Sequence, residues 1–96
     1  MLDLQHLKTF TVVATTKNFS RTALMLGYSQ STVTYHIKTL ERELGARLLS
    51  RFKFSRTIGL TDVGCRIFKY AAQIVALAEE TKAEVKRKDG EVGRGS

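Results

Sequence analysis

The side chains best suited to recognition chemistry gather between residues 29 and 38. They offer hydroxyls, an amide, a phenol and an ammonium group, and they belong to Ser29, Gln30, Ser31, Thr32, Thr34, Tyr35 and Lys38. At 100° per residue, Ser31, Tyr35 and Lys38 share the side of a helix that an apolar stripe leaves free. Such groups can exchange hydrogen bonds with base edges in the major groove of DNA, which admits a helix. This stretch is therefore a candidate nucleic-acid-reading element.

Catalytic chemistry has few candidates in this chain. The groups suited to acid–base or nucleophilic work are His36, Glu41, Glu43, Asp62 and Cys65. None has a partner at a suggestive spacing, and nothing evident near the cysteine would stabilise a thiolate. A catalytic pocket also needs convergent polar groups, which 96 residues hardly permit. We therefore predict that the chain is not an enzyme.

Metal and cofactor sites are not expected either. The two histidines, His6 and His36, are thirty positions apart, and neither has a cysteine or a second histidine at ligand spacing. The single cysteine, Cys65, excludes an intramolecular disulfide and fits a reducing cytoplasm. There is also no long apolar run, so we predict neither a signal peptide nor a membrane span.

One amphipathic helix carries the candidate recognition side chains. Its apolar residues recur in steps of four and three, at Val33, Ile37, Leu40 and Leu44. Ser29 can act as its N-cap, with the hydroxyl available to the amide of residue 31 or 32, and Gly45 can end it. Gly27 can adopt the left-handed conformation that ends a preceding helix. Helix, glycine turn and helix together predict a helix-turn-helix.

Two further helices are predicted before this turn. The first spans residues 4–16, with Asp3 as a possible cap and an apolar stripe at Leu4, Leu7, Phe10, Val13 and Ala14. The second is short and opens at Ser20 as its cap, with Ala23 and Leu26 on its inner side. A small residue such as Ala23 lets two helices cross closely.

The positive charge of the chain is concentrated in its first two thirds. The net charge is +7 and the pI is about 9.9. Residues 1–61 hold nine Lys or Arg against three acids, a balance of +6, whereas residues 62–96 hold seven against six, a balance of +1. This distribution indicates a polyanionic partner for residues 1–61. A membrane partner is not favoured, because no segment is a highly basic amphipathic helix.

A basic hairpin is predicted after the third helix. Leu48 and Leu49 would form a short strand or an anchoring contact, and the alternation in residues 52–54 followed by residues 58–60 resembles two strands. The cations in or beside this hairpin are Arg51, Lys53 and Arg56. They would contact phosphate or a narrow minor groove. The alternative is a solvated loop whose charges only keep it in water.

A long helix over residues 62–88 is predicted to dimerise. Thr61 and Asp62 cap it, and its apolar residues are Val63, Ile67, Phe68, Tyr70, Ala71, Ile74, Val75, Leu77, Ala78 and Val85. They cover about half the circumference, more than packing against one neighbour requires. One edge could lie on the first helix while the other meets a second copy. The predicted interface residues are Ile67, Phe68, Ala71, Ile74, Val75 and Ala78.

Residues 89–96 are predicted to be a disordered tail.

From Leu2 to about Lys88, the order of elements resembles the DNA-binding domain of LysR-type transcriptional regulators. The residues that carry the resemblance are Leu4, Leu7, Phe10, Ala14, Phe19, Ala23, Ser29, Gln30, Ile37, Leu40, Glu41, Leu44, Gly45, Leu48, Arg51, Leu60, Thr61 and Gly64. It implies a mostly α fold in which a winged helix-turn-helix at residues 1–61, with three helices and a small β-hairpin wing, precedes a linker helix.

The same resemblance implies a function and a set of partners. A homodimer joined through the linker helix would bind double-stranded DNA at an interrupted inverted repeat upstream of regulated genes. Family members also carry a C-terminal ligand-sensing domain, which this chain lacks, so a small-molecule inducer would bind outside it. Higher oligomers would then be a property of the full-length protein.

This chain departs from the family at positions that would read DNA. The family commonly has proline at 31, serine at 34, arginine at 35 and glutamine at 36, whereas this chain has Ser31, Thr34, Tyr35 and His36. The preferred operator therefore stays open. His36 itself has two readings at this point, a partly buried structural histidine or a phosphate contact.

A third class of function competes with DNA binding and catalysis. The long helix could form a coiled coil with a different protein, which would make the chain an interaction module. The +6 balance of residues 1–61 and the polar side of the third helix argue against this alternative.

Overall fold

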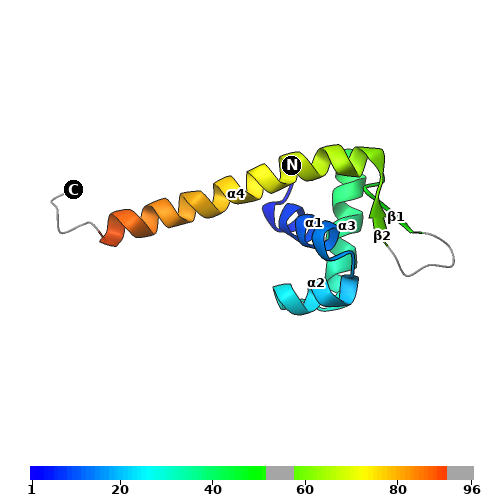
Figure 1. The fold of residues 1–96 in the computed structure, drawn as a ribbon, viewed down its shortest axis with the longest axis horizontal. Coiled ribbons are helices and arrows are strands. Elements are labelled where there is room, and N and C mark those ends of the chain that lie inside the picture. The colour runs from blue at the N-terminus through cyan, green and yellow to red at the C-terminus, as the bar shows by residue number, and fades with distance from the viewer. Residues whose placement is uncertain (52–57, 91–96) are drawn as a thin grey trace.

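The chain folds into a winged helix-turn-helix followed by one long helix, which confirms the predicted fold class (Figure 1). The computed structural model describes residues 1–51 and 58–90. Its elements in chain order are α1 (Leu4–Thr16), α2 (Phe19–Leu26), α3 (Gln30–Leu44), β1 (Leu49–Arg51), β2 (Ile58–Leu60) and α4 (Asp62–Gly90). None of the helices in the described part of the chain is long and apolar enough to cross a membrane.

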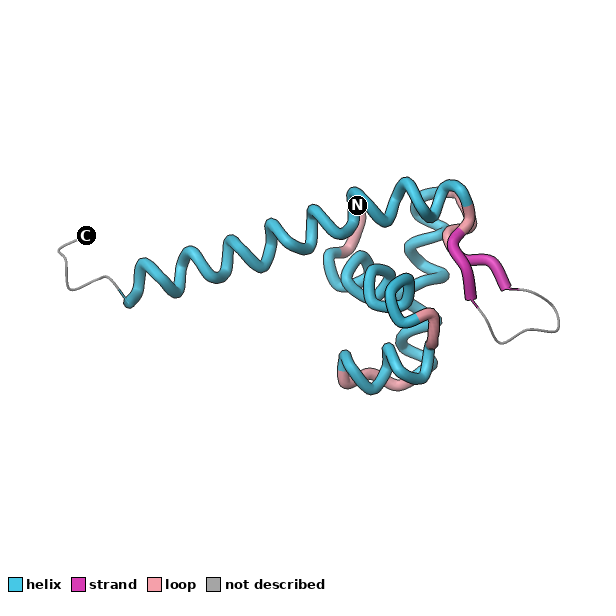
Figure 2. The backbone as a smooth tube through the Cα atoms, viewed as in Figure 1, coloured by secondary structure: helices cyan, strands magenta, loops and turns pink. Residues whose placement is uncertain are grey.

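The molecule is elongated because α4 extends well beyond the other elements. Its principal extents are 61 × 25 × 19 Å. With 29 residues at 1.5 Å each, α4 is about 44 Å long. Figure 2 shows α1 against the first half of α4 and α2 on the side of the body away from α4, with the two strands on the far side of this body from the C-terminal half of α4.

One core joins α1, α3 and the start of α4. It contains Leu7, Phe10, Val13, Ala23, Val33, Ile37, Leu40, Leu48, Leu49, Ile58 and Ala71. Phe10 is fully buried, and its ring meets that of Phe68 edge-on at a centroid distance of 6.4 Å. The predicted inner stripe of α3 is confirmed, with Leu44 packed at its margin. Leu4 was predicted to share the stripe of α1, but it lies in the first turn and stays 40% exposed.

Local capping fixes the two ends of α3 as predicted. The Ser29 hydroxyl accepts a hydrogen bond from the amide of Thr32 at 3.1 Å. Gly27 and Gly45 have φ angles of 73° and 69°, in the left-handed region where glycine is favoured. These caps set where α3 begins and ends, and therefore which of its turns face outward.

The predicted start of α2 is wrong by two positions. The helix begins at Phe19, and Asn18 rather than Ser20 is its N-cap, with its side-chain oxygen accepting from the amide of Arg21 at 2.8 Å. The reason lies in how α1 ends. Lys17 adopts a left-handed conformation with a φ of 56°, which turns the chain early and brings Asn18 to the extended conformation of a cap.

The two strands pair antiparallel, and the first begins at Leu49, within the short strand that was one of the two predictions for Leu48 and Leu49. Leu49 pairs with Leu60, and Arg51 pairs with Ile58. The described strand covers residues 49–51, with Leu49 buried in the core, and the predicted strand residues 52–54 lie outside the described residues. Leu48 is buried beside it, so the predicted anchoring contact is also present. The predicted tip with Lys53 and Arg56 lies outside the described residues.

The last helix starts at the predicted cap and extends slightly further than predicted. The Thr61 hydroxyl accepts a hydrogen bond from the amide of Gly64 at 2.9 Å. The predicted end was residue 88, and the helix continues to Gly90 because Lys88 and Asp89 do not interrupt a helix. The rest of the predicted tail, residues 91–96, lies outside the described residues.

One carboxylate connects α3 to the first strand. Glu41 accepts hydrogen bonds from the amides of Leu48 at 2.8 Å and Leu49 at 3.3 Å, and it lies 4.0 Å from the guanidinium Nε of Arg47. These contacts give Glu41 a structural role and pair it with a nearby basic side chain. The hairpin is thus held to the end of α3 by a charge-assisted contact.

Replacing Glu41 with glutamine should loosen this connection. The neutral side chain accepts less strongly from the two amides, so we expect Glu41→Gln to lower the free energy of unfolding by about 1.5 to 3 kcal/mol. Glu43→Gln is the matched control, since Glu43 only faces the exposed N-terminal ammonium of Met1 at 3.9 Å. Urea unfolding monitored by circular dichroism measures both. Equal stability of the two variants would contradict the assigned role of Glu41.

Candidate nucleic-acid interface

The exposed side of α3 presents the polar side chains identified in the sequence. Gln30, Ser31, Tyr35 and Lys38 are exposed, while Thr32 and Thr34 are half-buried. Tyr35 is 62% exposed, although Val33 and Leu40 on the other side of the same helix are fully buried. The helix therefore offers donors and acceptors to a partner without any change in its packing.

The first turn of α3 is rigidified by its own hydroxyls. Besides capping the helix, the Ser29 hydroxyl lies 3.0 Å from the hydroxyl of Thr32. Ser29 and Thr32 therefore stabilise the helix start, and Gln30 and Ser31 between them are held on its exposed side. The free amides of this turn also favour an anion such as a phosphate.

Behind Tyr35 lies a cluster of rings that sequence reasoning missed. The rings of His6 and His36 are 4.5 Å apart, and Tyr35 lies 6.1 Å from the first and 6.3 Å from the second, measured between centroids. The Nδ1 atom of His36 is 2.8 Å from the hydroxyl of Thr9, a fully buried residue of α1. His36 is thus bound to α1, which supports the structural reading over the phosphate contact. The pairing joins residues 27 apart, so no local pattern in the sequence could have shown it.

The environment of His36 disfavours its charged form. Burial lowers the pKa of the His36 ring below its ordinary value of 6.5, the neighbouring His6 lowers it further, and Asp3 acts in the opposite direction. The ring therefore stays neutral at pH 7.

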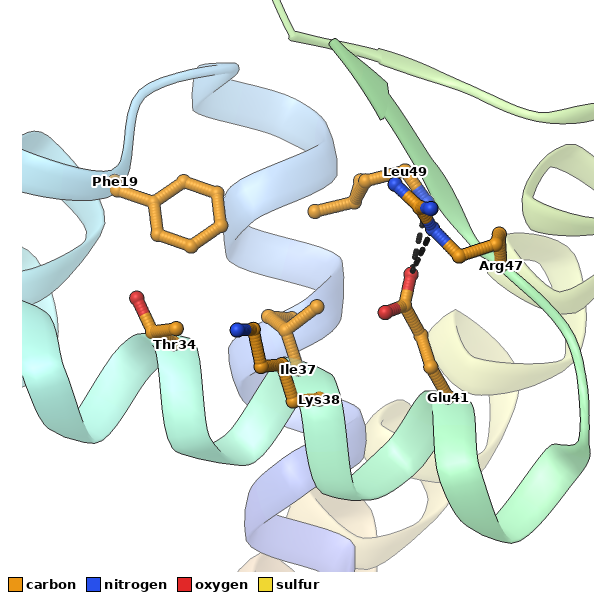
Figure 3. A pocket seen from close by; sticks show the side chains of 7 residues that line it. All are labelled: Phe19, Thr34, Ile37, Lys38, Glu41, Arg47 and Leu49. Atoms are coloured by element: carbon orange, nitrogen blue, oxygen red, sulfur yellow. Dashed lines mark hydrogen bonds and ion pairs between the residues drawn. The ribbon is translucent and has the colours of Figure 1, made fainter.

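A pocket of about 260 Å³ lies beside the recognition side of α3 (Figure 3). It is lined by Phe19, Thr34, Ile37, Lys38, Glu41, Arg47 and Leu49. Figure 3 shows the Glu41 carboxylate turned toward Arg47 and Leu49, with the Lys38 side chain on the same side of α3. Thr34 and Lys38 thus line a pocket between α3, the start of α2 and the first strand.

The cations of the hairpin are only partly placed. Arg47, just before β1, has a side chain that is 78% exposed. Arg51 ends β1, but its side chain, like Lys53 and Arg56, lies outside the described part of the chain. The described cations on or beside the exposed side of α3 therefore include Lys38, Arg42 and Arg47.

Some residues of the predicted dimer interface on α4 are buried within the chain, and others are exposed. Ala71 is fully buried in the core of its own chain, and Phe68 and Val75 pack against that core. The inclusion of Ala71 was therefore wrong, because the helix surface around it is already covered within the chain. Ile67 and Ala78 are half-buried, and Ile74 is 40% exposed.

Two exposed apolar residues of α4 were left out of that predicted interface. Tyr70 and Leu77 are 65% and 62% exposed and lie one turn on either side of Ile74. The three positions follow steps of four and three, the spacing of a continuous helical stripe. The spacing of apolar residues in the sequence includes Tyr70 and Leu77. It could not show which edge of the apolar stripe is covered by the rest of the chain.

The candidate catalytic groups are not brought together. Cys65 is exposed at the start of α4, and His36 lies in the ring cluster against α1. Within residues 1–51 and 58–90, no three His, Cys, Asp or Glu side chains are grouped so that they could hold a metal ion.

Comparison with known proteins places this architecture in a family. Residues 4–65 match the model of bacterial regulatory helix-turn-helix proteins of the lysR family. The uncharacterized regulator YwqM of Bacillus subtilis is 43% identical over 81 residues, which cover 84% of this chain and 27% of that protein. The regulator CitR of the same organism is 41% identical over 86 residues, covering 90% and 29%. The chain therefore spans less than a third of the length of these relatives.

Solved structures show the same fold, and complexes with DNA are among them. The DNA-binding domain of BenM with catB site 1 DNA aligns with a TM-score of 0.82 at 29% identity, covering 93% of this chain and 94% of that one. The DNA-binding domain of CbnR with DNA aligns with a TM-score of 0.78 at 31% identity, covering 91% and 98%. This chain belongs to the lysR family of bacterial regulatory helix-turn-helix proteins, and it forms the DNA-binding domain of such a regulator.

Proposed function

We propose that this chain binds double-stranded DNA sequence-specifically as a homodimer, at an interrupted inverted repeat, and thereby regulates transcription. The observation that carries the proposal is the exposed polar side of α3, opposite a fully buried apolar stripe. A helix fixed in this way can enter the major groove with its N-terminal turns. The complexes of BenM and CbnR with DNA support the same use of the fold.

Two sets of side chains have different roles in this proposal. Gln30, Ser31, Thr34 and Tyr35 reach base edges and set sequence preference. The cations contact phosphates and supply affinity with little discrimination; they are Lys38, Arg47, Arg51, Lys53 and Arg56. For Arg51, Lys53 and Arg56 this role rests on the sequence alone. Because the partner is genomic DNA, we place the chain in the cytoplasm.

Dimerisation through α4 would explain the exposed apolar residues on that helix. Tyr70, Ile74 and Leu77 form a stripe beside the surface that α1 covers. Packing this stripe against a second copy removes it from water and relates the two α3 helices by a twofold axis. The two bodies would be held apart by α4, which gives two half-sites separated by unread base pairs. In a longer regulator of this family, a small-molecule inducer would bind outside this chain.

Changing Tyr35 to arginine should change the preferred operator. A phenol can donate one hydrogen bond or contact a thymine methyl group, whereas arginine donates two hydrogen bonds to guanine. We expect the preference to shift toward guanine at one position of each half-site, by about 1 to 3 kcal/mol if the contact is well formed. Binding-site selection from a random duplex library, followed by sequencing, measures this shift.

Arg47→Ala is the control for this experiment. It removes an exposed cation that would contact only phosphate, so selected and random duplexes should weaken alike and the selected site should stay the same. The division of roles would be refuted if Tyr35→Arg returned the parent site while Arg47→Ala altered it.

Charging the exposed stripe of α4 should separate the dimer. The double variant Ile74→Asp, Leu77→Asp would bury two carboxylates in the proposed interface, and we expect a monomer in sedimentation equilibrium at concentrations where the parent is a dimer. Ala76→Asp with Ala83→Asp places the same charges on another side of α4 and should leave the dimer intact. A parent chain that is monomeric at high micromolar concentration, or a dimer lost only in the control, would rule out this interface.

A further inference from the structure

The two histidines of the chain face each other directly behind the recognition side of α3. His6 comes from α1 and His36 from α3, and their rings are tilted by 37° at a centroid distance of 4.5 Å. The side chain of His6 is only 12% exposed, and its Nδ1 atom is buried without a hydrogen-bond partner among the described residues. A buried ring nitrogen without a hydrogen-bond partner lowers the stability of the fold, and it makes the pair sensitive to the addition of a proton.

The rest of the cluster connects this pair to Tyr35. The ring of Tyr35 stands edge-on to His6, with an interplanar angle of 89°. The Tyr28 ring packs edge-on against His36 at 5.1 Å, and its hydroxyl donates to the side-chain oxygen of Gln5 at 3.2 Å. Tyr35 is mostly exposed, so these ring contacts are what limits the directions that it can take.

We propose that His6 and His36 act together as positioning residues for Tyr35, and that uptake of a proton by the pair frees this ring and weakens discrimination between DNA sequences. This inference rests on the proposed function, because it concerns the residue assigned there to base reading. The pair does not touch DNA in this proposal. It acts through the orientation of Tyr35.

The geometry explains why a proton disturbs the cluster. In the neutral pair each ring has one N–H and one bare nitrogen, and a proton taken from water must occupy a bare nitrogen. On His6 an added proton at Nδ1 would be a buried donor without an acceptor among the described residues. On His36 the Nδ1 atom would be forced to donate to Thr9 Oγ1. Two protonated rings at this distance would also repel each other.

The surrounding charges do not cancel this effect. The charged or titratable groups facing the pair are Asp3 from the α1 cap, Tyr28 from the turn and Tyr35 from α3. Asp3 is 4.0 Å from His6 and favours a charged ring, yet the pKa of His36 is still lowered by burial and by His6. Because the pKa of His36 is lowered, its neutral form persists at pH 6.5 and is lost as the pH falls through the lowered pKa.

Protonation also adds positive charge near DNA, so total affinity is the wrong quantity to follow. The informative quantity is the ratio of affinities for the selected operator and a random duplex. We expect this ratio in the parent to fall by about 3- to 10-fold between pH 7.5 and pH 5.5, the effect of losing one well-placed base contact. In His36→Gln and in His6→Phe the fall should be smaller, because one imidazole remains beside Tyr35, and in the double variant the ratio should stay constant within about twofold.

The two variants test different parts of the cluster. His36→Gln keeps a side chain that can hydrogen-bond Thr9 and removes a titrating ring, whereas His6→Phe keeps the aromatic contact with Tyr35 and removes the buried nitrogen. Nuclear magnetic resonance of the 96-residue chain without DNA follows the His and Tyr rings from pH 8 to pH 5. The Tyr35 signals should shift with the same midpoint as the histidines, and they should stop shifting in this window when both substitutions are combined.

Tyr35 signals that stay unchanged while the histidines titrate would overturn the proposal, whether or not the chain binds DNA. A ratio of affinities that does not change while the Tyr35 signals move would overturn the role in sequence discrimination. If the chain discriminated between no duplexes at any pH, the proposed function would fail instead, and the Tyr35 signals would still decide whether the pair positions that ring.

Discussion

The outward direction of Tyr35 depends on the burial of the opposite side of α3. Val33 and Leu40 are fully buried and Ile37 nearly so, in a core shared with Phe10 and Ala71. Each fully buried aliphatic side chain contributes about 1.5 to 3 kcal/mol, so α3 cannot rotate about its axis without a large loss of stability. The same packing fixes the hairpin through Glu41 and the start of α4 through the core. Recognition therefore rests on apolar contacts that no DNA partner would touch.

The features predicted correctly are those that depend on nearby residues. The period of four and three in α3 and the left-handed glycines at positions 27 and 45 are local, and the structure has them as expected. The errors arose where neighbouring residues compete for one role or where packing decides exposure. Asn18 rather than Ser20 caps α2 because Lys17 directly before it takes the left-handed conformation, and Leu4 stays exposed although it belongs to the apolar stripe of α1.

The predictions for the candidate site also differ in success between local features and contacts that join distant residues. The sequence predicted which side chains of α3 lie on its exposed side, because a helical period assigns sides. It could not predict that His6 lies behind Tyr35, since that contact depends on how α1 crosses α3. On α4 the spacing of the apolar residues predicted the full width of the apolar side of the helix. Only the packing of α1 shows that Ala71 is covered and that Tyr70, Ile74 and Leu77 are left in water.

The central claim is that the first turns of α3 meet the bases while the second half of α4 stays away from DNA. Amide chemical-shift mapping by nuclear magnetic resonance, during titration with the selected operator duplex, tests this directly. We expect the largest changes at residues 29–35, with small changes beyond residue 78 of α4. Largest changes on α4 around Leu77, with residues 29–35 unaffected, would contradict the claim and assign the partner surface to the long helix.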